Sequence, residues 1–137
     1  MRKTILLGAV FLSSLVFTQQ RSPIVGGDVD VHGCRASAGF TYSQIKNVCV
    51  KVFEQKIKLK EVDSDKNSTS MTAVIFSKDM KRAEIFIPEG NAKSIILDKE
   101  GKSKMWKSGN YIKETYVLVP YKKKGYQIKK DDVVIYQ

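Results

Sequence analysis

A succession of short β-type segments, separated by turn residues, occupies the chain from residue 55 onward. The first segment, 55–62 (QKIKLKEV), alternates apolar and charged residues, which is typical of a half-buried strand. The predicted strands are 55–62, 71–76, 83–87, 94–97, 103–107, 116–121, 126–129 and 133–136, with 111–113 as a short additional candidate. Glycine, asparagine, aspartate and lysine fill the connections. This spacing predicts an antiparallel meander folded as a small barrel or a strongly curved sheet.

An apolar stripe with helical spacing precedes the strands. Its members are Ile45, Val48, Cys49, Val52 and Phe53, at i, i+3, i+4, i+7 and i+8. Ser43 stands just before the stripe, where its hydroxyl can accept an orphan N–H of the first turn. The spacing predicts a helix over 43–54 that packs on one face of the sheet or closes one of its ends. The expected fold is therefore α+β and mainly β.

The N-terminus has the composition of a secretory signal. Arg2 and Lys3 precede an uncharged segment, 5–17, that is shorter than the about 20 apolar residues needed to span a bilayer. The alternative is a buried N-terminal helix, which the basic start disfavours. We expect a signal peptide over 1–18, a flexible tether over 19–31 and a single globular domain over 32–137. The protein would then be periplasmic or secreted.

Cys34 and Cys49 are the two cysteines of the chain. An exported chain favours a disulfide between them, which would tie a loop to the predicted helix. Closing a loop of this length stabilises a fold by roughly 3 kcal/mol in the chain-entropy model. The alternative is two buried free thiols. The spacing is not that of a C-x-x-C redox pair. His32 is the single histidine, and a zinc site needs four ligands or three plus water, so a metal site is not expected.

The same region resembles a family of small, largely uncharacterised envelope proteins of Gram-negative bacteria. The matching residues are Gly33-Cys34, Ser37-Ala38-Gly39-Phe40-Thr41-Tyr42-Ser43, Cys49 and Phe53-Glu54. The family pattern is GC, SAGY, an aromatic–Ser pair, a second Cys and Phe-Glu. Phe40 and Tyr42 stand where the family usually has tyrosine and often has tryptophan, and both keep an aromatic ring. The resemblance implies structural roles for these residues and no known chemistry.

The basic charge is concentrated toward the C-terminus. The chain has a net charge of +10, which becomes +8 without Arg2 and Lys3. Residues 93–137 hold 11 basic and 5 acidic groups, whereas residues 19–92 hold 11 and 9. Lysines interleaved with aromatic rings could bind an anionic polymer or a glycan. The candidate ligand-binding residues are Trp106, Lys107, Tyr111, Tyr121, Lys122, Lys123, Lys124 and Tyr126. The alternative is a solvated lysine surface that keeps edge strands from aggregating.

Catalytic patterns do not emerge from the sequence. It carries no Ser/His/Asp set, no Cys/His pair with catalytic spacing, no phosphate-binding loop and no metal-ligand cluster. Asp131 and Asp132 are neighbours in the chain, so their side chains diverge and do not by themselves form an acid/base pair. We expect no enzymatic activity, no cofactor, no metal and no nucleic-acid partner. The expected function is an envelope protein that binds an anionic ligand, a glycan or a protein, and a structural role is an alternative.

The C-terminal half is also similar in outline to the periplasmic inhibitors of c-type lysozyme. Those proteins combine an eight-stranded barrel with a Ser-Gly-x-x-Tyr loop that enters the lysozyme cleft. Here Ser108-Gly109-Asn110-Tyr111 is one residue shorter. The resemblance implies an inhibitor loop built from Ser108, Gly109 and Tyr111, with lysozyme as the partner. A cationic lysozyme would be repelled by this basic chain, so inhibition is a second hypothesis.

Overall fold

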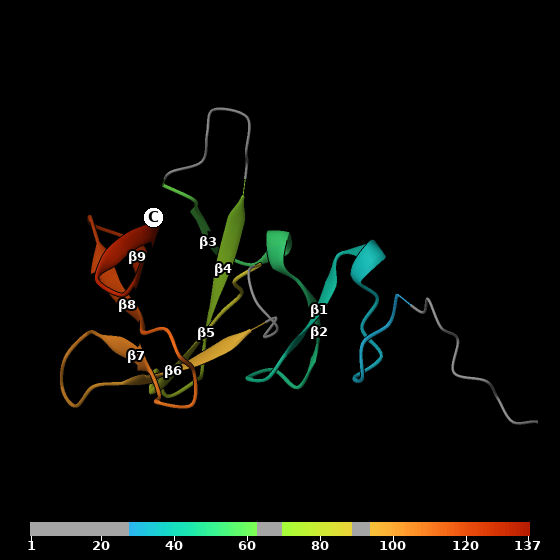
Figure 1. The fold of residues 1–137 in the computed structure, drawn as a ribbon, viewed down its shortest axis with the longest axis horizontal. Helices are drawn as coiled ribbons and strands as arrows, with labels where there is room; N and C mark the ends of the chain where they lie inside the picture. The colour runs from blue at the N-terminus through green and yellow to red at the C-terminus, as the bar shows by residue number, and fades with distance from the viewer. Residues whose placement is uncertain (1–27, 63–69, 89–93) are drawn as a thin grey trace, which may run out of the picture.

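The computed structural model describes residues 28–62, 70–88 and 94–137. Two short 3₁₀ helices and ten strands make up this part of the chain (Figure 1). The elements are η1 (Ala36–Ala38), β1 (Phe40–Ser43), β2 (Val48–Lys51), η2 (Val52–Glu54), β3 (Ile57–Lys60), β4 (Met71–Phe76), β5 (Arg82–Ile85), β6 (Ile95–Lys99), β7 (Trp106–Ser108), β8 (Tyr116–Tyr121), β9 (Gly125–Lys130) and β10 (Val133–Tyr136). The predicted signal peptide, 1–18, and most of the predicted tether, 19–31, lie outside the described residues.

Strands β3 to β10 form one antiparallel sheet in which sequence order is also spatial order. The two outer strands meet through a bridge between Glu61 and Tyr136 and through backbone bonds. Lys60 and Gln137 exchange N–H···O bonds of 3.0 and 2.9 Å, and the Val62 N–H donates to Ile135 O at 3.0 Å. The sheet is therefore nearly closed into a barrel, and the predicted antiparallel meander is confirmed. Residues 111–113 form a turn region, so the additional strand predicted there was wrong.

Alternate side chains of the strands fill the barrel interior. Leu97, Leu118 and Ile128 are fully buried, and Ile85 lies against them from β5. The same alternation places charged side chains such as Lys58 and Lys107 on the outside. The interior is filled with aliphatic and aromatic side chains and forms the hydrophobic core. Residues available to a ligand therefore lie at the ends of the barrel and on its outer face.

The predicted helix over 43–54 was wrong. These residues form the end of β1, a turn, β2 and η2, and β1 pairs with β2 in a separate antiparallel hairpin. The stripe that suggested a helix does not become one buried face, because Val48 is 53% exposed and Phe53 is 50% exposed. Asn47 adopts φ +54° in the connecting turn, a conformation that asparagine tolerates and that a continuous helix excludes. Tertiary contacts of the hairpin outweigh the weak helical periodicity.

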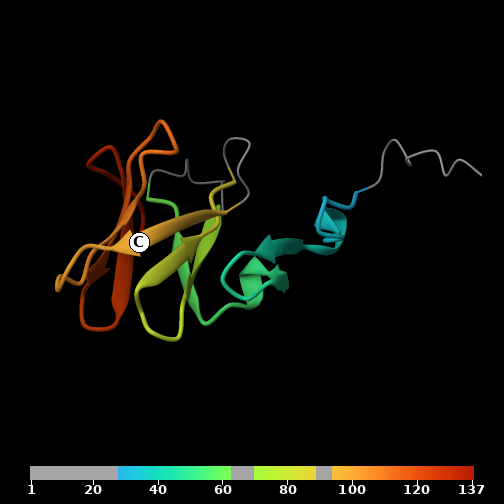
Figure 2. The same cartoon turned by 90° about the horizontal axis from the view of Figure 1, so that it is seen from below.

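The hairpin packs on the outer face of β4 and β5 (Figures 1 and 2). Val50 covers Ala73, Ile75 and Phe86, which point away from the barrel interior. The Cys34–Cys49 disulfide is present and joins the loop before η1 to β2, as predicted from the two cysteines. Residues 28–31, the described part of the predicted tether, lie beside this loop, since Val29 forms an antiparallel bridge with Arg35.

A buried carboxylate fixes the hairpin to the barrel. Glu84 of β5 is fully buried and accepts the Ser43 hydroxyl at 2.6 Å and the Gln44 N–H at 2.8 Å. The Ile45 N–H donates at 3.3 Å to the same carboxylate oxygen that accepts the Ser43 hydroxyl, whereas the Gln44 N–H donates to the other oxygen. Ser43, expected as a helix cap, therefore donates to a carboxylate 41 residues away in the sequence.

The connections between strands alternate between the two ends of the barrel, because each strand runs antiparallel to its neighbour. The β4–β5, β6–β7 and β8–β9 turns lie at one end. In Figure 2 the β4–β5 and β8–β9 turns are at the bottom of the barrel and the β6–β7 turn projects to the left. The β7–β8 loop and the β9–β10 turn lie at the opposite end. In the part of the chain that the structure describes, no helix is long and apolar enough to cross a membrane.

Candidate functional site

The end of the barrel that carries the β4–β5, β6–β7 and β8–β9 turns is strongly basic. We call it the basic end and define it by the residues 77–82, 99–105 and 121–125. Its basic residues are Lys78, Lys81, Arg82, Lys99, Lys102, Lys104, Lys122, Lys123 and Lys124, and its acidic residues are Asp79 and Glu100. The three turns together have a net charge of +7. Eight of the nine basic side chains are exposed and Lys99 is half-buried.

The opposite end of the barrel has a different charge. Two of its connections, 109–115 between β7 and β8 and 130–133 between β9 and β10, hold two basic and three acidic residues, a net charge of −1. None of the nine basic side chains of the basic end forms an ion pair with a residue that the structure describes. The positive charge at the basic end is therefore available to an anionic ligand. The two ends of the barrel also differ in charge, so the described part of the molecule is electrostatically polarised along the barrel.

An aromatic cluster inside the barrel supports the basic end. The ring of Phe76 lies 4.9 Å from that of Trp106 and 5.2 Å from that of Tyr126, measured between centroids. Trp106 is buried, and its indole Nε1–H donates to Met80 O at 2.9 Å. This bond links the cluster to the β4–β5 turn. The Lys99 N–H donates to Lys81 O at 2.8 Å and joins the same turn to β6.

Asp79 shapes the β4–β5 turn from within. Its carboxylate accepts the Ser77 hydroxyl at 2.6 Å and the Lys81 N–H at 3.0 Å. These bonds, the Ser77 hydroxyl above all, lower the pKa of Asp79 below its usual value. Between this turn and β6 lies an open hollow lined by Lys81, Arg82 and Lys99 together with Asp79 and Asp98. Three cations and two carboxylates thus line the hollow.

The β8–β9 turn contributes three consecutive lysines. Lys122 adopts φ +54°, and its ammonium lies 5.2 Å from the centroid of the Tyr121 ring, a cation–π distance. Lys123 and Lys124 are exposed. Tyr126, just after the turn, points inward to Phe76, so its ring contributes to support and not to an outer surface.

The predicted ligand-binding residues are divided between several places. Tyr121 and Lys122 to Lys124 belong to the basic end, whereas Trp106 and Tyr126 lie beneath it in the aromatic cluster. Lys107 lies on the outer face of β7, where its ammonium is 4.0 Å from Glu100. Tyr111 lies at the opposite end of the barrel and is 66% exposed.

The predicted inhibitor loop does not project freely. Ser108 is buried at the end of β7, and its hydroxyl accepts the Tyr116 N–H at 2.9 Å. The Tyr111 hydroxyl donates to Ile96 O at 2.6 Å, which holds the ring against the barrel wall. Burial raises the pKa of Tyr111, with a smaller contribution from the Asp98 charge. Gly109 lies under the Tyr111 ring, where an added Cβ would come within 2.7 Å of it.

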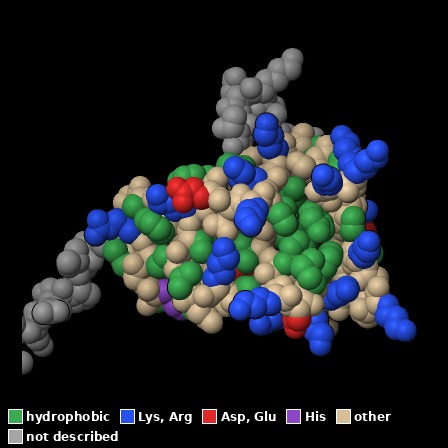
Figure 3. Space-filling view, turned by 180° about the vertical axis from the view of Figure 1, so that it is seen from behind, with side chains coloured by type: hydrophobic (Ala, Val, Ile, Leu, Met, Phe, Trp, Pro, Cys, Tyr) green, Lys and Arg blue, Asp and Glu red, His purple; other side chains and the backbone are tan. Residues whose placement is uncertain are grey.

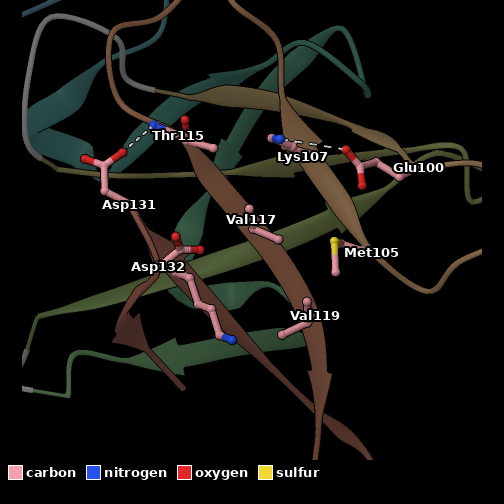
Figure 4. A pocket seen from close by; sticks show the side chains of 9 residues that line it. Glu100, Met105, Lys107, Thr115, Val117, Val119, Asp131 and Asp132 are labelled. Carbon is pink, nitrogen blue, oxygen red and sulfur yellow. Dashed lines mark hydrogen bonds and ion pairs between the residues drawn. The ribbon is translucent and has the colours of Figure 1, made fainter.

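A shallow hollow of about 470 Å³ lies on the outer face of β7, β8 and β9 (Figure 4). Met105, Val117 and Val119 form its apolar floor. Lys107 and Glu100 are paired on one side, and Asp131 accepts the Thr115 N–H on the other. The charged groups along its rim carry both signs, so it has no preference for an anion.

Several members of the basic end were missed from the sequence: Lys78, Lys81, Arg82, Lys99 and Lys102. The signal that could have found them is topological. In an antiparallel meander every second connection lies at the same end, so the second, fourth and sixth connections of the predicted sheet could have been grouped.

No group of three or more histidine, cysteine, aspartate or glutamate side chains suited to a metal occurs within the described ranges. The fold and the site define a disulfide-linked hairpin on a nearly closed eight-stranded antiparallel barrel with one basic end. A scan against protein-family models, a search of curated proteins and a search of solved structures each gave no match.

Proposed function

We propose that this protein is a non-catalytic, exported binding protein that holds an anionic ligand at its basic end. The observation that carries the proposal is the set of nine basic side chains, gathered from three separate turns without ion-pair partners in the described chain. A net excess of charges of one sign, here +7, destabilises the folded state by repulsion, whereas an anionic ligand relieves that repulsion.

The disulfide supports export of the protein. Disulfides persist in oxidising compartments, and the Cys34–Cys49 bond agrees with a periplasmic or secreted location. The N-terminal composition supports the same location. In that setting the accessible anionic ligands are phosphate- or carboxylate-bearing envelope components.

Lysozyme inhibition is the second candidate function. The eight strands of the barrel and the exposed ring of Tyr111 favour it. The burial of Ser108 and the bond that holds the Tyr111 hydroxyl count against it, because both groups would have to be released to enter a cleft. Loss of lysozyme inhibition on Tyr111→Ala would support this candidate.

The proposal is tested by measuring the binding of inorganic polyphosphate to the oxidised protein at low and high salt. Binding should weaken as salt rises, because the Debye length falls from about 10 Å at 0.1 M to about 3 Å at 1 M. The triple variant Lys122→Gln, Lys123→Gln, Lys124→Gln should bind less tightly than the wild type.

A matched control removes the same three charges elsewhere. Lys46, Lys60 and Lys113 are exposed and lie outside the basic end, so their replacement by glutamine changes net charge equally. If both triple variants lose the same affinity, total charge and not the basic end determines binding, and the proposal fails. It also fails if the wild type does not bind polyphosphate at low salt.

A further inference from the structure

We infer that the basic end docks on an anionic lipid bilayer, with Met80 at the acyl boundary and the surrounding lysines and arginine on the headgroups. This inference rests on the proposed function and names its ligand. It is drawn from a second property of the basic end, namely the apolar side chains among its cations.

Apolar and basic side chains are arranged around one another on this part of the surface. Met80 stands at the tip of the β4–β5 turn and is 39% exposed, between Lys78 and Lys81. Met105 and Tyr121 are half-buried in and beside the other two turns. The space-filling view from behind shows an apolar patch on the barrel with lysine and arginine side chains around it (Figure 3). An apolar centre within a basic ring is the arrangement that binds an anionic interface.

The backbone at Met80 indicates that its exposure is not incidental. Met80 adopts φ +59°, a left-handed conformation that glycine and asparagine occupy at lower cost than methionine. Its carbonyl is held by the buried Trp106 indole, which fixes the conformation. Both the backbone and the solvent therefore disfavour methionine here in the free protein. A bilayer that buries the side chain removes the second of these penalties.

The charges of the two barrel ends suit an anionic surface. The three turns belong to the same end of the barrel, and each carries exposed cations. The β7–β8 and β9–β10 connections at the opposite end have a net charge of −1, so an anionic surface attracts one end and not the other. A hydrophilic polyanion would use the cations but leave Met80 in water. A bilayer uses both, and this difference favours lipid over a soluble polymer.

The test compares one set of proteins on three probes: neutral phosphatidylcholine vesicles, vesicles that also contain phosphatidylglycerol, and soluble polyphosphate. All proteins are purified from the same host with the Cys34–Cys49 disulfide formed. Their N-termini are therefore processed in the same way, and any contribution of the N-terminal residues is common to all of them. The variants are Met80→Asn, the Lys122/Lys123/Lys124→Gln triple and the Lys46/Lys60/Lys113→Gln control. Thermal unfolding of each variant shows whether it remains folded.

Wild-type protein should bind the anionic vesicles and not the neutral ones. A basic residue near an anionic membrane changes affinity about fivefold, so the basic-end triple should lose about a hundredfold and the control triple much less. Met80→Asn should lose about tenfold on anionic vesicles and nothing on polyphosphate. Its thermal midpoint should be equal to or above that of the wild type, because asparagine relieves the backbone conformation.

Two results separate failure of this inference from failure of the proposed function. Tight polyphosphate binding combined with vesicle binding that Met80→Asn leaves unchanged would overturn the bilayer inference and leave the anion-binding function intact. Absence of binding to both polyphosphate and anionic vesicles would overturn both. Equal binding to neutral and anionic vesicles would overturn the role of the cations.

Discussion

Replacing Glu84 by alanine should release the hairpin from the barrel. The substitution removes the acceptor of three hydrogen bonds, from the Ser43 hydroxyl and from the Gln44 and Ile45 N–H groups. Each buried donor left without a partner costs about 1 to 3 kcal/mol. The Ile45 bond is long and Gln44 is exposed, so water can replace part of the loss. We expect the free energy of unfolding to fall by about 3 kcal/mol.

The glutamine variant at the same position gives a graded comparison. Glu84→Gln keeps an oxygen for the Gln44 N–H but turns an amide NH₂ toward the Ser43 hydroxyl and the Ile45 N–H. The hydroxyl can rotate to accept, whereas the N–H cannot, so the loss should be about 1.5 kcal/mol.

Urea unfolding and amide exchange measure these effects. Glu54→Ala is the control, because this carboxylate is exposed and its one ion pair within the described part of the chain is with Lys51, so its loss should cost less than about 1 kcal/mol. Amide exchange at Gln44 and Ile45 should accelerate in Glu84→Ala before exchange in the barrel does. If Glu84→Ala were as stable as Glu54→Ala, the carboxylate would not hold the hairpin and the reasoning would be refuted.

Three further predictions concern the disulfide, the aromatic cluster and pH. Replacing Cys34 and Cys49 by alanine should lower the free energy of unfolding by about 3 kcal/mol, measured in denaturant; an unchanged midpoint would contradict this. Trp106→Phe keeps a ring but removes the bond to Met80 O, so we expect a loss of about 1 to 2 kcal/mol and faster amide exchange in the β4–β5 turn, whereas unchanged exchange would deny that bond a role. The lowered pKa of Asp79 means that its ionised form stabilises the fold above its unfolded pKa and that this contribution is lost as pH falls through the lower folded value. Asp79→Asn should therefore be less sensitive to acid than the wild type in unfolding experiments below about pH 4, and equal acid sensitivity would contradict the assignment.

The strands were predictable because each one carries its own local evidence. Segment 133–136 matches β10 residue for residue, and 71–76 matches β4, since both are rich in β-branched and aromatic residues and lie next to turn residues. The prediction at 43–54 failed because a four-residue strand followed by a 3₁₀ turn can imitate helical spacing over one dozen residues. The hairpin is held in part by Glu84, a partner on a distant strand that no local pattern reveals.

The candidate site was only partly predictable for a related reason. The run Lys122 to Lys124 stands out in the sequence, and the structure places it at the basic end. Lys81 and Lys99 stand in separate turns, and their proximity depends on the barrel, as does the place of Trp106 beneath them. Interleaved aromatics and lysines suggested one surface, but the inward and outward alternation of strands sends neighbours such as Trp106 and Lys107 to opposite sides.

Closure of the barrel also sets the order in which the chain can fold. From β3 to β10, each strand pairs with the next strand in the sequence. The contact that closes the barrel instead joins Glu61 to Tyr136, which are far apart in the sequence. Hairpins can therefore form as soon as their two strands are present, but the last pairing must wait for β10 and carries the largest loop-closure entropy. Until then β3 and β9 are open edges, able to pair with another chain. The interval before β10 docks is when this protein is most prone to aggregate, and a partner that shields β3 during that interval would raise the yield of folded protein.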